Sequence, residues 1–142
     1  MAGSGVAGVR TLIFDLLVHT SSKVSTMTTT LFILNDAPYG NERAYNALRL
    51  AAALADKEGQ QVQLFLMADA VACAKAGQKV PTGYYNLQLM VGKVVRKGAV
   101  ALCGTCMDAR GLTEAEIMEG TRRSTLAELA EWTAQADKVL VF

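Results

Sequence analysis

The fold class is decided by the stretch TLFILNDAPYGN at residues 30–41. Its first five residues are an apolar run of β-favouring side chains, and the seven that follow are typical of a turn. From Ala44 to Glu58, apolar residues recur at intervals of three and four, which predicts an amphipathic helix that ends at Gly59. A strand, a short turn and a helix form the first part of a crossover unit in a parallel sheet.

The same alternation continues along the chain. Apolar β-favouring runs predict further strands at residues 62–67, 100–103 and 139–142. A short helix is expected at residues 69–76, and helical spacing of apolar residues predicts another at residues 84–97. The chain therefore predicts an α/β protein with a three-layer α/β/α architecture and a parallel sheet of four to five strands.

Three further segments complete this prediction. Capping-box spacings at Thr113 and Thr125 predict two more helices, of which the second is longer. Residues 120–124 are the weakest strand candidate, because Gly120 and two adjacent arginines disfavour it. The continuous apolar run at 139–142 predicts a strand that is covered on both faces.

Composition limits the class of protein. With 142 residues, of which 51% are hydrophobic, the chain suits one domain with a full core. A net charge of +1 argues against nucleic acid or an anionic membrane surface as a partner. The sequence contains no run of roughly 18 apolar residues that would cross a bilayer. High apolar content with only 6% aromatic residues favours self-association, so a homo-oligomer is expected.

Residues 1–26 are interpreted as a segment outside the predicted domain. Asp15 interrupts the apolar run from Leu12 to Val18, and no small-residue cleavage pattern follows, so we do not interpret residues 1–26 as a signal peptide. We expect an N-terminal extension at 1–26, disordered or non-native, and a single domain at 27–142. Three cysteines without an export signal indicate free thiols in a reducing compartment, most simply the cytoplasm.

The sharpest chemical signal follows the strand predicted at 100–103. Cys103 ends that strand, the backbone N–H groups of Gly104, Thr105 and Cys106 come next, and Arg110 lies seven residues further on. Backbone donors and a guanidinium group favour the thiolate, which is the nucleophilic form of cysteine. Cys103 is therefore the catalytic candidate. Cys106 either resolves an oxidised or persulfidated Cys103 or packs as a thiol against the core.

Other chemistries fit the sequence less well. Zinc needs four ligands, and besides the Cys103 pair only Cys73 and His19 are soft candidates, so we expect no metal site. Cys73 lies in a small-residue stretch, and we assign it to packing. The phosphate-binding G-x-x-x-x-G-K-[ST] pattern is absent, and the G-x-G-x-x-G spacing occurs only at residues 3–8, where no predicted strand precedes it, so no cofactor is expected. His19 is the single histidine, which argues against Ser-His-Asp hydrolysis.

The loop after the first strand supplies candidates for substrate binding. In a parallel sheet it shares the carboxyl edge with Cys103, so its residues could line the same pocket. They could equally serve only to form the turn. The substrate-binding candidates are Asn35, Asp36, Pro38, Tyr39, Gly104, Thr105 and Arg110.

Several motifs resemble one known family. They are NDAPYG at 35–40, LFLMADAV at 64–71, LCGTC at 102–106 with Arg110-Gly111, and the ending ELAEWT at 128–133 with ADKVL at 136–140. In this order they resemble the DsrE/DsrF-like family, and within it the YchN-type branch. The resemblance covers nearly everything from Leu31 to Phe142.

The resemblance implies a three-layer fold and homotrimers or hexamers whose active-site loops lie near subunit contacts. It also implies sulfur handling: related sulfur-relay subunits of the TusD type hold sulfur as a persulfide on one cysteine, which corresponds to Cys103. Those subunits generally lack a second cysteine at the position of Cys106.

These observations lead to three hypotheses. The first is a small oligomeric sulfur carrier or sulfurtransferase-like protein that takes sulfur from a donor protein onto Cys103 and passes it to an acceptor protein. The second is a non-catalytic oligomeric protein that binds a small ligand between residues 35–39 and Cys103. The third is a redox protein in which Cys103 and Cys106 form a reversible disulfide.

Overall fold

The computed structural model describes residues 26–142, and the sequence analysis of residues 1–25 lies outside them. Five strands form one entirely parallel sheet in the order β4-β3-β2-β1-β5. The strands are β1 (Thr28–Leu34), β2 (Gln60–Leu66), β3 (Ala99–Cys103), β4 (Thr121–Ser124) and β5 (Lys138–Val141). The expected parallel α/β sheet is confirmed, and the weakest candidate, 120–124, is its fifth strand.

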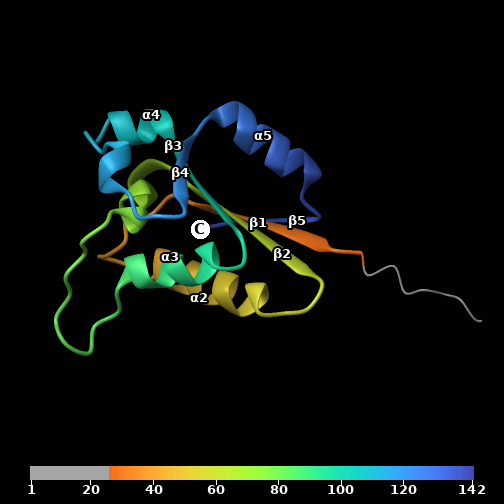
Figure 1. Ribbon diagram of the computed structural model, residues 1–142, viewed down its shortest axis with the longest axis horizontal. Helices are drawn as coiled ribbons and strands as arrows, with labels where there is room; N and C mark the ends of the chain where they lie inside the picture. Colours follow the sequence, from red (N-terminus) through yellow and green to blue (C-terminus); the bar gives the residue numbers. More distant parts are fainter. Residues whose placement is uncertain (1–25) are drawn as a thin grey trace, which may run out of the picture.

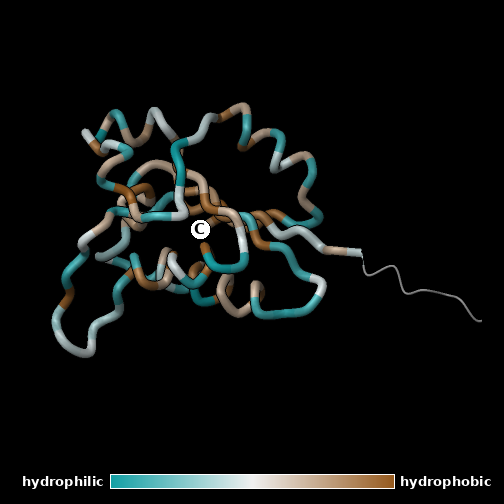
Figure 2. The backbone as a smooth tube through the Cα atoms, viewed as in Figure 1, coloured by the Kyte–Doolittle hydropathy of each residue, from teal (hydrophilic) through white to brown (hydrophobic). Residues whose placement is uncertain are grey.

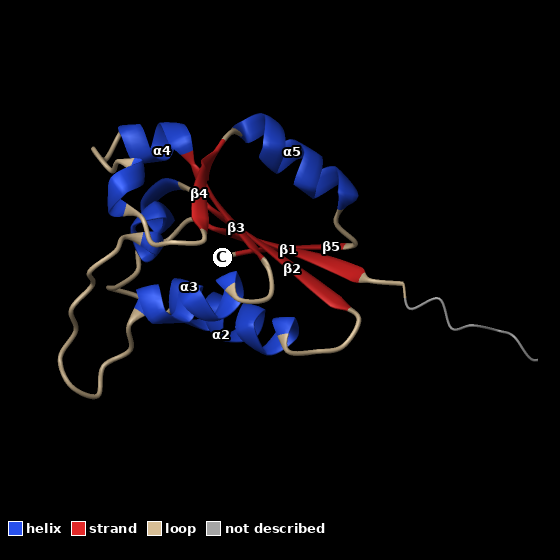
Figure 3. Cartoon of the chain, in the orientation of Figure 1, coloured by secondary structure: helices blue, strands red, loops and turns tan. Residues whose placement is uncertain are grey.

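Within residues 26–142, four α-helices and two short 3-10 helices join the strands. The α-helices are α2 (Arg43–Ala55), α3 (Leu87–Val95), α4 (Gly104–Asp108) and α5 (Leu126–Gln135). The 3-10 helices are η1 (Ala68–Ala74) and η2 (Glu114–Glu116). Helices α2 and α3 cover one face of the sheet and α5 covers the other, which gives three layers (Figure 1 and Figure 3).

The core lies between these layers because both sheet faces carry apolar side chains. Phe32, Phe65 and Leu102 on the three central strands are fully buried. On the α5 side, Phe65 meets Trp132 edge to face, with ring centroids 6.1 Å apart. Figure 2 shows the hydrophobic segments gathered along the central strands, and the turn between α2 and β2 as hydrophilic. That turn ends at Gly59, whose φ of +73° is costly for other residues.

Two helices are shorter than the sequence predicts. The helix expected from residue 84 begins at Leu87, because the Asn86 side chain caps it by accepting a hydrogen bond from the Leu89 N–H at 3.2 Å. The second shortened helix is the one expected after Thr113. There the Glu116 carboxylate accepts a hydrogen bond from the Thr113 N–H at 2.9 Å, as the capping box predicts. Only the 3-10 helix η2 follows, because Ile117 turns into extended backbone and pairs with Lys75.

The prediction that residues 139–142 are covered on both faces is wrong for this chain. Strand β5 is an edge strand that pairs only with β1, and Val141 is 63% exposed. A continuous apolar run does not distinguish a central strand from an edge strand. In residues 26–142, no helix combines the length and apolarity that a membrane crossing requires.

Candidate functional site

Cys103 lies where a buried strand changes into a helix. It is the last residue of β3 and the N-cap of α4. Its Sγ accepts a hydrogen bond from the backbone N–H of Cys106 at 3.3 Å, and the Thr105 hydroxyl lies 3.3 Å from the same atom. The helical turn that places these donors also brings Cys106 back beside Cys103. The local fold therefore surrounds one sulfur atom with polar groups.

Cys103 and Cys106 form a disulfide in this structure, with their Cα atoms 5.2 Å apart. In the reduced state the same backbone N–H and hydroxyl groups would favour a Cys103 thiolate, because hydrogen bonds to sulfur stabilise its charged form. Cys106 is half-buried, so it does not pack wholly in the core. The two sulfur atoms are close enough for one to resolve a modification of the other.

A pocket of about 310 Å³ opens beside Cys103. Cys103, Gly104 and Thr105 line one side, and residues 123–126, at the end of β4 and the start of α5, line the other. The two sides adjoin because β4 pairs in parallel with β3, with Ser124 opposite Cys103. Although Cys103 is only 8% exposed, its side chain faces an opening rather than a sealed core.

Arg123 is a pocket residue that the sequence analysis missed. It makes two hydrogen bonds to the Asp108 carboxylate, at 2.8 and 2.7 Å, and these lower the pKa of Asp108 and raise that of Arg123. A Cβ atom at Gly104 would lie 2.8 Å from the Arg123 Nε, so the absence of a side chain lets the guanidinium group cover the first turn of α4. The sequence feature that could have identified Arg123 is the weak strand candidate at 120–124, because the pairing of this strand with β3 places Arg123 beside the Cys103 pocket.

Arg110 also contacts α4, through a hydrogen bond to the backbone of Cys106. Its guanidinium group donates to Asp69 Oδ1 at 2.9 and 2.7 Å and to the carbonyl oxygen of Cys106 at 3.0 Å. It does not line the pocket beside Cys103. Asp69 follows Ala68, whose φ of +45° is strained for a residue with a side chain. Arg110 therefore links the start of η1 to the cysteine turn.

The loop at 35–39 lies at the same carboxyl edge of the sheet but does not line the Cys103 pocket. Asn35 donates its backbone N–H to the Phe142 carbonyl oxygen at 2.8 Å, where β1 and β5 end. Asp36 pairs with Arg43 at 3.7 Å. The Tyr39 hydroxyl donates to Gln78 Oε1 at 2.6 Å. Pro38 is half-buried in the same turn. Of the sequence candidates, the pocket brings together Cys103, Gly104 and Thr105.

The third cysteine has a different environment. Cys73 on η1 is fully buried, and burial raises the pKa of its thiol to about 12. The residue packs in the core, as its small neighbours suggest. Across residues 26–142 no three His, Cys, Asp or Glu side chains are grouped so that they could hold a metal ion.

A parallel three-layer α/β protein with a Cys-x-x-Cys turn at the carboxyl end of a strand is the class that the fold and site define. The DsrE/DsrF-like family model matches residues 29–142, and the chain belongs to that family. Protein YchN of Escherichia coli is 43% identical over 113 residues, which is 79% of this chain and 97% of YchN. MK0008 of Methanopyrus kandleri is 40% identical over 111 residues, which is 78% of this chain and 90% of the relative.

Solved structures agree with this assignment. The crystal structure of YchN from Escherichia coli superposes with a TM-score of 0.77 at 44% identity, and the match covers 82% of this chain and all of that one. MTH1491 from Methanobacterium thermoautotrophicum superposes with a TM-score of 0.65 at 11% identity, over 81% of this chain and 99% of that one. The second likeness concerns the fold alone.

Proposed function

We propose that this protein is a sulfur carrier, or a sulfurtransferase-like protein, that holds sulfur as a persulfide on Cys103. The observation that carries the proposal is the position of Cys103 Sγ, which lies at a pocket, accepts a backbone N–H and has a second cysteine within bonding reach. Membership of the DsrE/DsrF-like family supports a role related to sulfur relay.

Loading follows from the nucleophilicity of the thiolate. The Cys103 thiolate attacks the outer sulfur of a donor persulfide, R–S–S–H. The donor S–S bond breaks as a new S–S bond forms on Cys103, and the donor leaves as a thiolate that carries the electron pair. An acceptor thiolate then attacks the outer sulfur and releases the Cys103 thiolate. Neither transfer needs an external oxidant.

Cys106 provides a second reaction by which the transferred sulfur can leave Cys103. Its thiolate attacks the inner sulfur of the Cys103 persulfide, which forms the Cys103–Cys106 disulfide and expels hydrosulfide. Two equivalents of a thiol reductant then restore both thiols. The disulfide in this structure corresponds to the product of that step. Cys106 would thus limit how long the persulfide survives.

The proposal assigns the surroundings as follows. Gly104 and Thr105 border the space through which a donor sulfur approaches, and Arg110 fixes the Cys106 carbonyl group. The 35–39 loop lies at the same sheet edge, where a docked donor or acceptor protein would cover it. The proposal also includes the cytoplasm as the compartment and a homotrimer or hexamer as the active form. Sedimentation of the purified chain tests the assembly, and a monomer would contradict it.

Intact-mass spectrometry after incubation with a persulfide donor tests the carrier. The reduced wild type should gain one sulfur atom, and Cys103→Ser should gain none. Cys73→Ala is the matched control and should load like the wild type. Equal loading of wild type and Cys103→Ser would contradict the proposal.

Thiol–disulfide exchange is the second candidate, because the structure contains the Cys103–Cys106 bond. In that case a disulfide substrate should oxidise the pair and lower the free-thiol count by two, whereas a persulfide donor should leave no extra sulfur on Cys103. Mass spectra of Cys106→Ser, which cannot close the disulfide, separate the two functions: this variant should keep the added sulfur if the protein is a carrier and gain none if it exchanges disulfides.

A further inference from the structure

All four tyrosines of this chain gather in one cluster, far from the cysteine pair in sequence. Tyr84 and Tyr85 stack with ring centroids 4.5 Å apart, Tyr45 lies 4.4 Å from Tyr85, and Tyr39 lies 5.9 Å from Tyr85. Tyr84 is 52% exposed, so part of its ring has no protein neighbour. The tyrosines join the loop before α3 to the start of α2.

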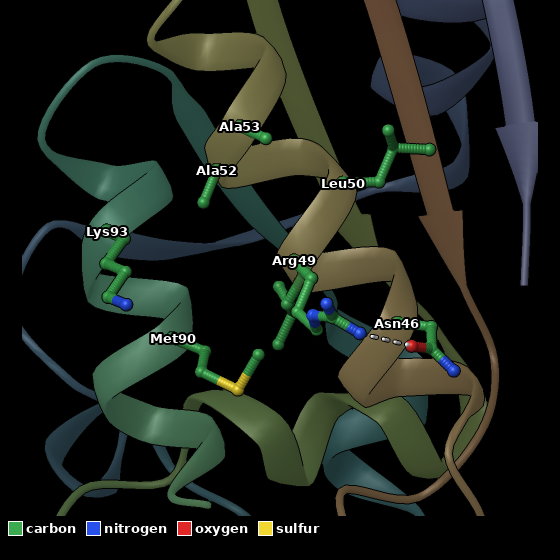
Figure 4. Close-up of a pocket in the computed structure, with 8 residues that line it drawn as sticks. Asn46, Arg49, Leu50, Ala52, Ala53, Met90 and Lys93 are labelled. Atoms are coloured by element: carbon green, nitrogen blue, oxygen red, sulfur yellow. Dashed lines mark hydrogen bonds between the residues drawn. The ribbon is translucent and has the colours of Figure 1, made fainter.

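The cluster forms one wall of a groove between α2 and α3. A hollow of about 670 Å³ is bordered by Tyr45, Tyr84 and Tyr85, and a second of about 510 Å³ continues along the two helices. Arg49, Met90 and Lys93 border both hollows, so the two adjoin. Figure 4 shows Met90 and Lys93 on α3 at one side of this groove and Arg49 on α2 at the other, with the Arg49 guanidinium group turned toward Asn46. Each volume lies in the range of roughly 300–1,000 Å³ that is typical of small-ligand sites.

The groove has a positive charge that no carboxylate in its lining neutralises. Arg49 donates to Asn46 Oδ1 at 3.3 Å, and its guanidinium carbon lies 5.4 Å from the centre of the Tyr45 ring. These contacts hold the guanidinium group in place without cancelling its charge. Neither Arg49 nor Lys93 forms an ion pair within residues 26–142. The cations that do face a carboxylate there are Arg43, Lys75, Lys97, Arg110, Arg122 and Arg123.

Tyr85, at the centre of the cluster, remains neutral at physiological pH. A hydrogen bond with Tyr84 raises the pKa of Tyr85 to about 12, and burial and the charge of Glu42 act in the same direction. Glu42 itself does not border the groove. An anion entering between the helices would therefore meet two cations and no carboxylate in the lining.

We propose that the groove between α2 and α3 binds a small anionic ligand that carries a planar aromatic ring, of the class of a nucleoside monophosphate. The ring stacks on the exposed side of Tyr84, because offset aromatic stacking is favourable. The anionic group lies between Arg49 and Lys93, where charge-assisted hydrogen bonds are strongest. This site is on the face covered by α2 and α3, whereas the Cys103 pocket is lined by residues of β3, α4 and β4 and by the start of α5 (Figure 1). The inference does not depend on sulfur transfer.

Calorimetric titration of the full chain with adenosine monophosphate tests the site. We expect one saturable site per chain, and binding at least about tenfold weaker for adenosine and for inorganic phosphate, because each lacks one of the two recognised groups. Arg49→Gln and Lys93→Gln should each weaken binding by about tenfold, the equivalent of one charge-assisted hydrogen bond. Lys138→Gln on β5 is the matched control and should bind like the wild type.

Both cations are exposed, so their variants should fold, and unchanged melting temperatures check this. Tyr84→Leu should weaken adenosine monophosphate binding but leave phosphate binding unchanged. Absence of saturable binding, or equal affinity in wild type and the double variant, would overturn the proposal. A change in sedimentation of Arg49→Gln/Lys93→Gln without nucleotide binding would also overturn it, because the groove would then be a contact between copies. Persulfide loading should be the same with and without the nucleotide.

Discussion

Cys103 and Cys73 are both buried cysteines, at 8% and 0% exposure, yet their surroundings differ in kind. Cys73 packs among the small apolar residues of η1, and burial raises the pKa of its thiol to about 12. Cys103 touches a backbone N–H and a hydroxyl group and borders a pocket. The exposed fraction alone does not separate them. Polar contacts and an opening at the sulfur atom make the difference.

The largest effect expected from this comparison is in alkylation rate. In the reduced native protein, iodoacetamide should modify Cys103 at least about 100-fold faster than Cys73, because only the thiolate reacts and desolvation suppresses it at Cys73. Peptide mapping after short exposures measures both rates. In denaturant the two rates should converge. Comparable native rates would break the distinction between the two sites.

Replacement by serine should affect the stability of the protein more at Cys73 than at Cys103, which is the reverse of the order in alkylation rate. Cys73→Ser introduces a hydroxyl group into an apolar core and should lower the free energy of unfolding by about 2 kcal/mol. Cys103→Ser retains polar partners and should cost less than about 1 kcal/mol under reducing conditions. Urea denaturation of the two variants measures this difference. A larger loss for Cys103→Ser would contradict the contrast in polarity.

Cys106 sharpens the comparison because Cys73 has no such partner. We expect Cys106→Ser to prolong the lifetime of the Cys103 persulfide by about tenfold, since attack by a neighbouring thiolate is removed. Mass spectra at timed intervals after donor removal follow the decay. A lifetime equal to that of the wild type would show that Cys106 does not discharge the persulfide.

The smallest expected effect is the loss of stability on replacing Glu128, which contacts the pocket residue Ser124. Glu128 pairs with Arg122 and accepts the hydroxyl of Ser124, which lowers the pKa of Glu128 to about 2. A carboxyl group with a lowered folded-state pKa stabilises the protein above its unfolded value of about 4.5, and this stabilisation is lost as the pH falls toward 2. Glu128→Gln should cost about 1 kcal/mol at pH 7, because the pair is partly exposed.

The cost of Glu128→Gln should disappear between pH 4.5 and pH 2. Denaturation of wild type and variant at several pH values measures it. A difference that stays constant down to pH 2 would contradict the assigned pKa.

The sequence predicted the parts of the fold that depend on local pattern. Apolar runs located β1, β2, β3 and β5, apolar periodicity located α2, and the capping-box spacing at Thr125 located α5. The edge position of β5 was not predictable, because a run of apolar residues is equally suited to a central strand. The helix expected after Thr113 is short because Ile117 pairs with Lys75, a contact 42 residues away.

The candidate site divides in the same way, into residues that local pattern located and residues that only distant contacts place. The strand-to-turn pattern located Cys103, Gly104 and Thr105, which the pocket brings together. Arg123 was missed because only the pairing of β4 with β3 carries it to Gly104. Arg110 was selected by its nearness in sequence, but its partner Asp69 lies 41 residues away and holds it outside the pocket. Contacts between distant segments decided what the sequence pattern could not.

The most direct test is the chemical state of Cys103 in protein taken from its native cells. The sample is trapped at once with an alkylating reagent and analysed by peptide mass spectrometry. We predict that a fraction of the Cys103 peptide carries one additional sulfur atom, whereas Cys73 remains an unmodified thiol. Additional sulfur on Cys73, or a Cys103 peptide that never carries it, would contradict the account.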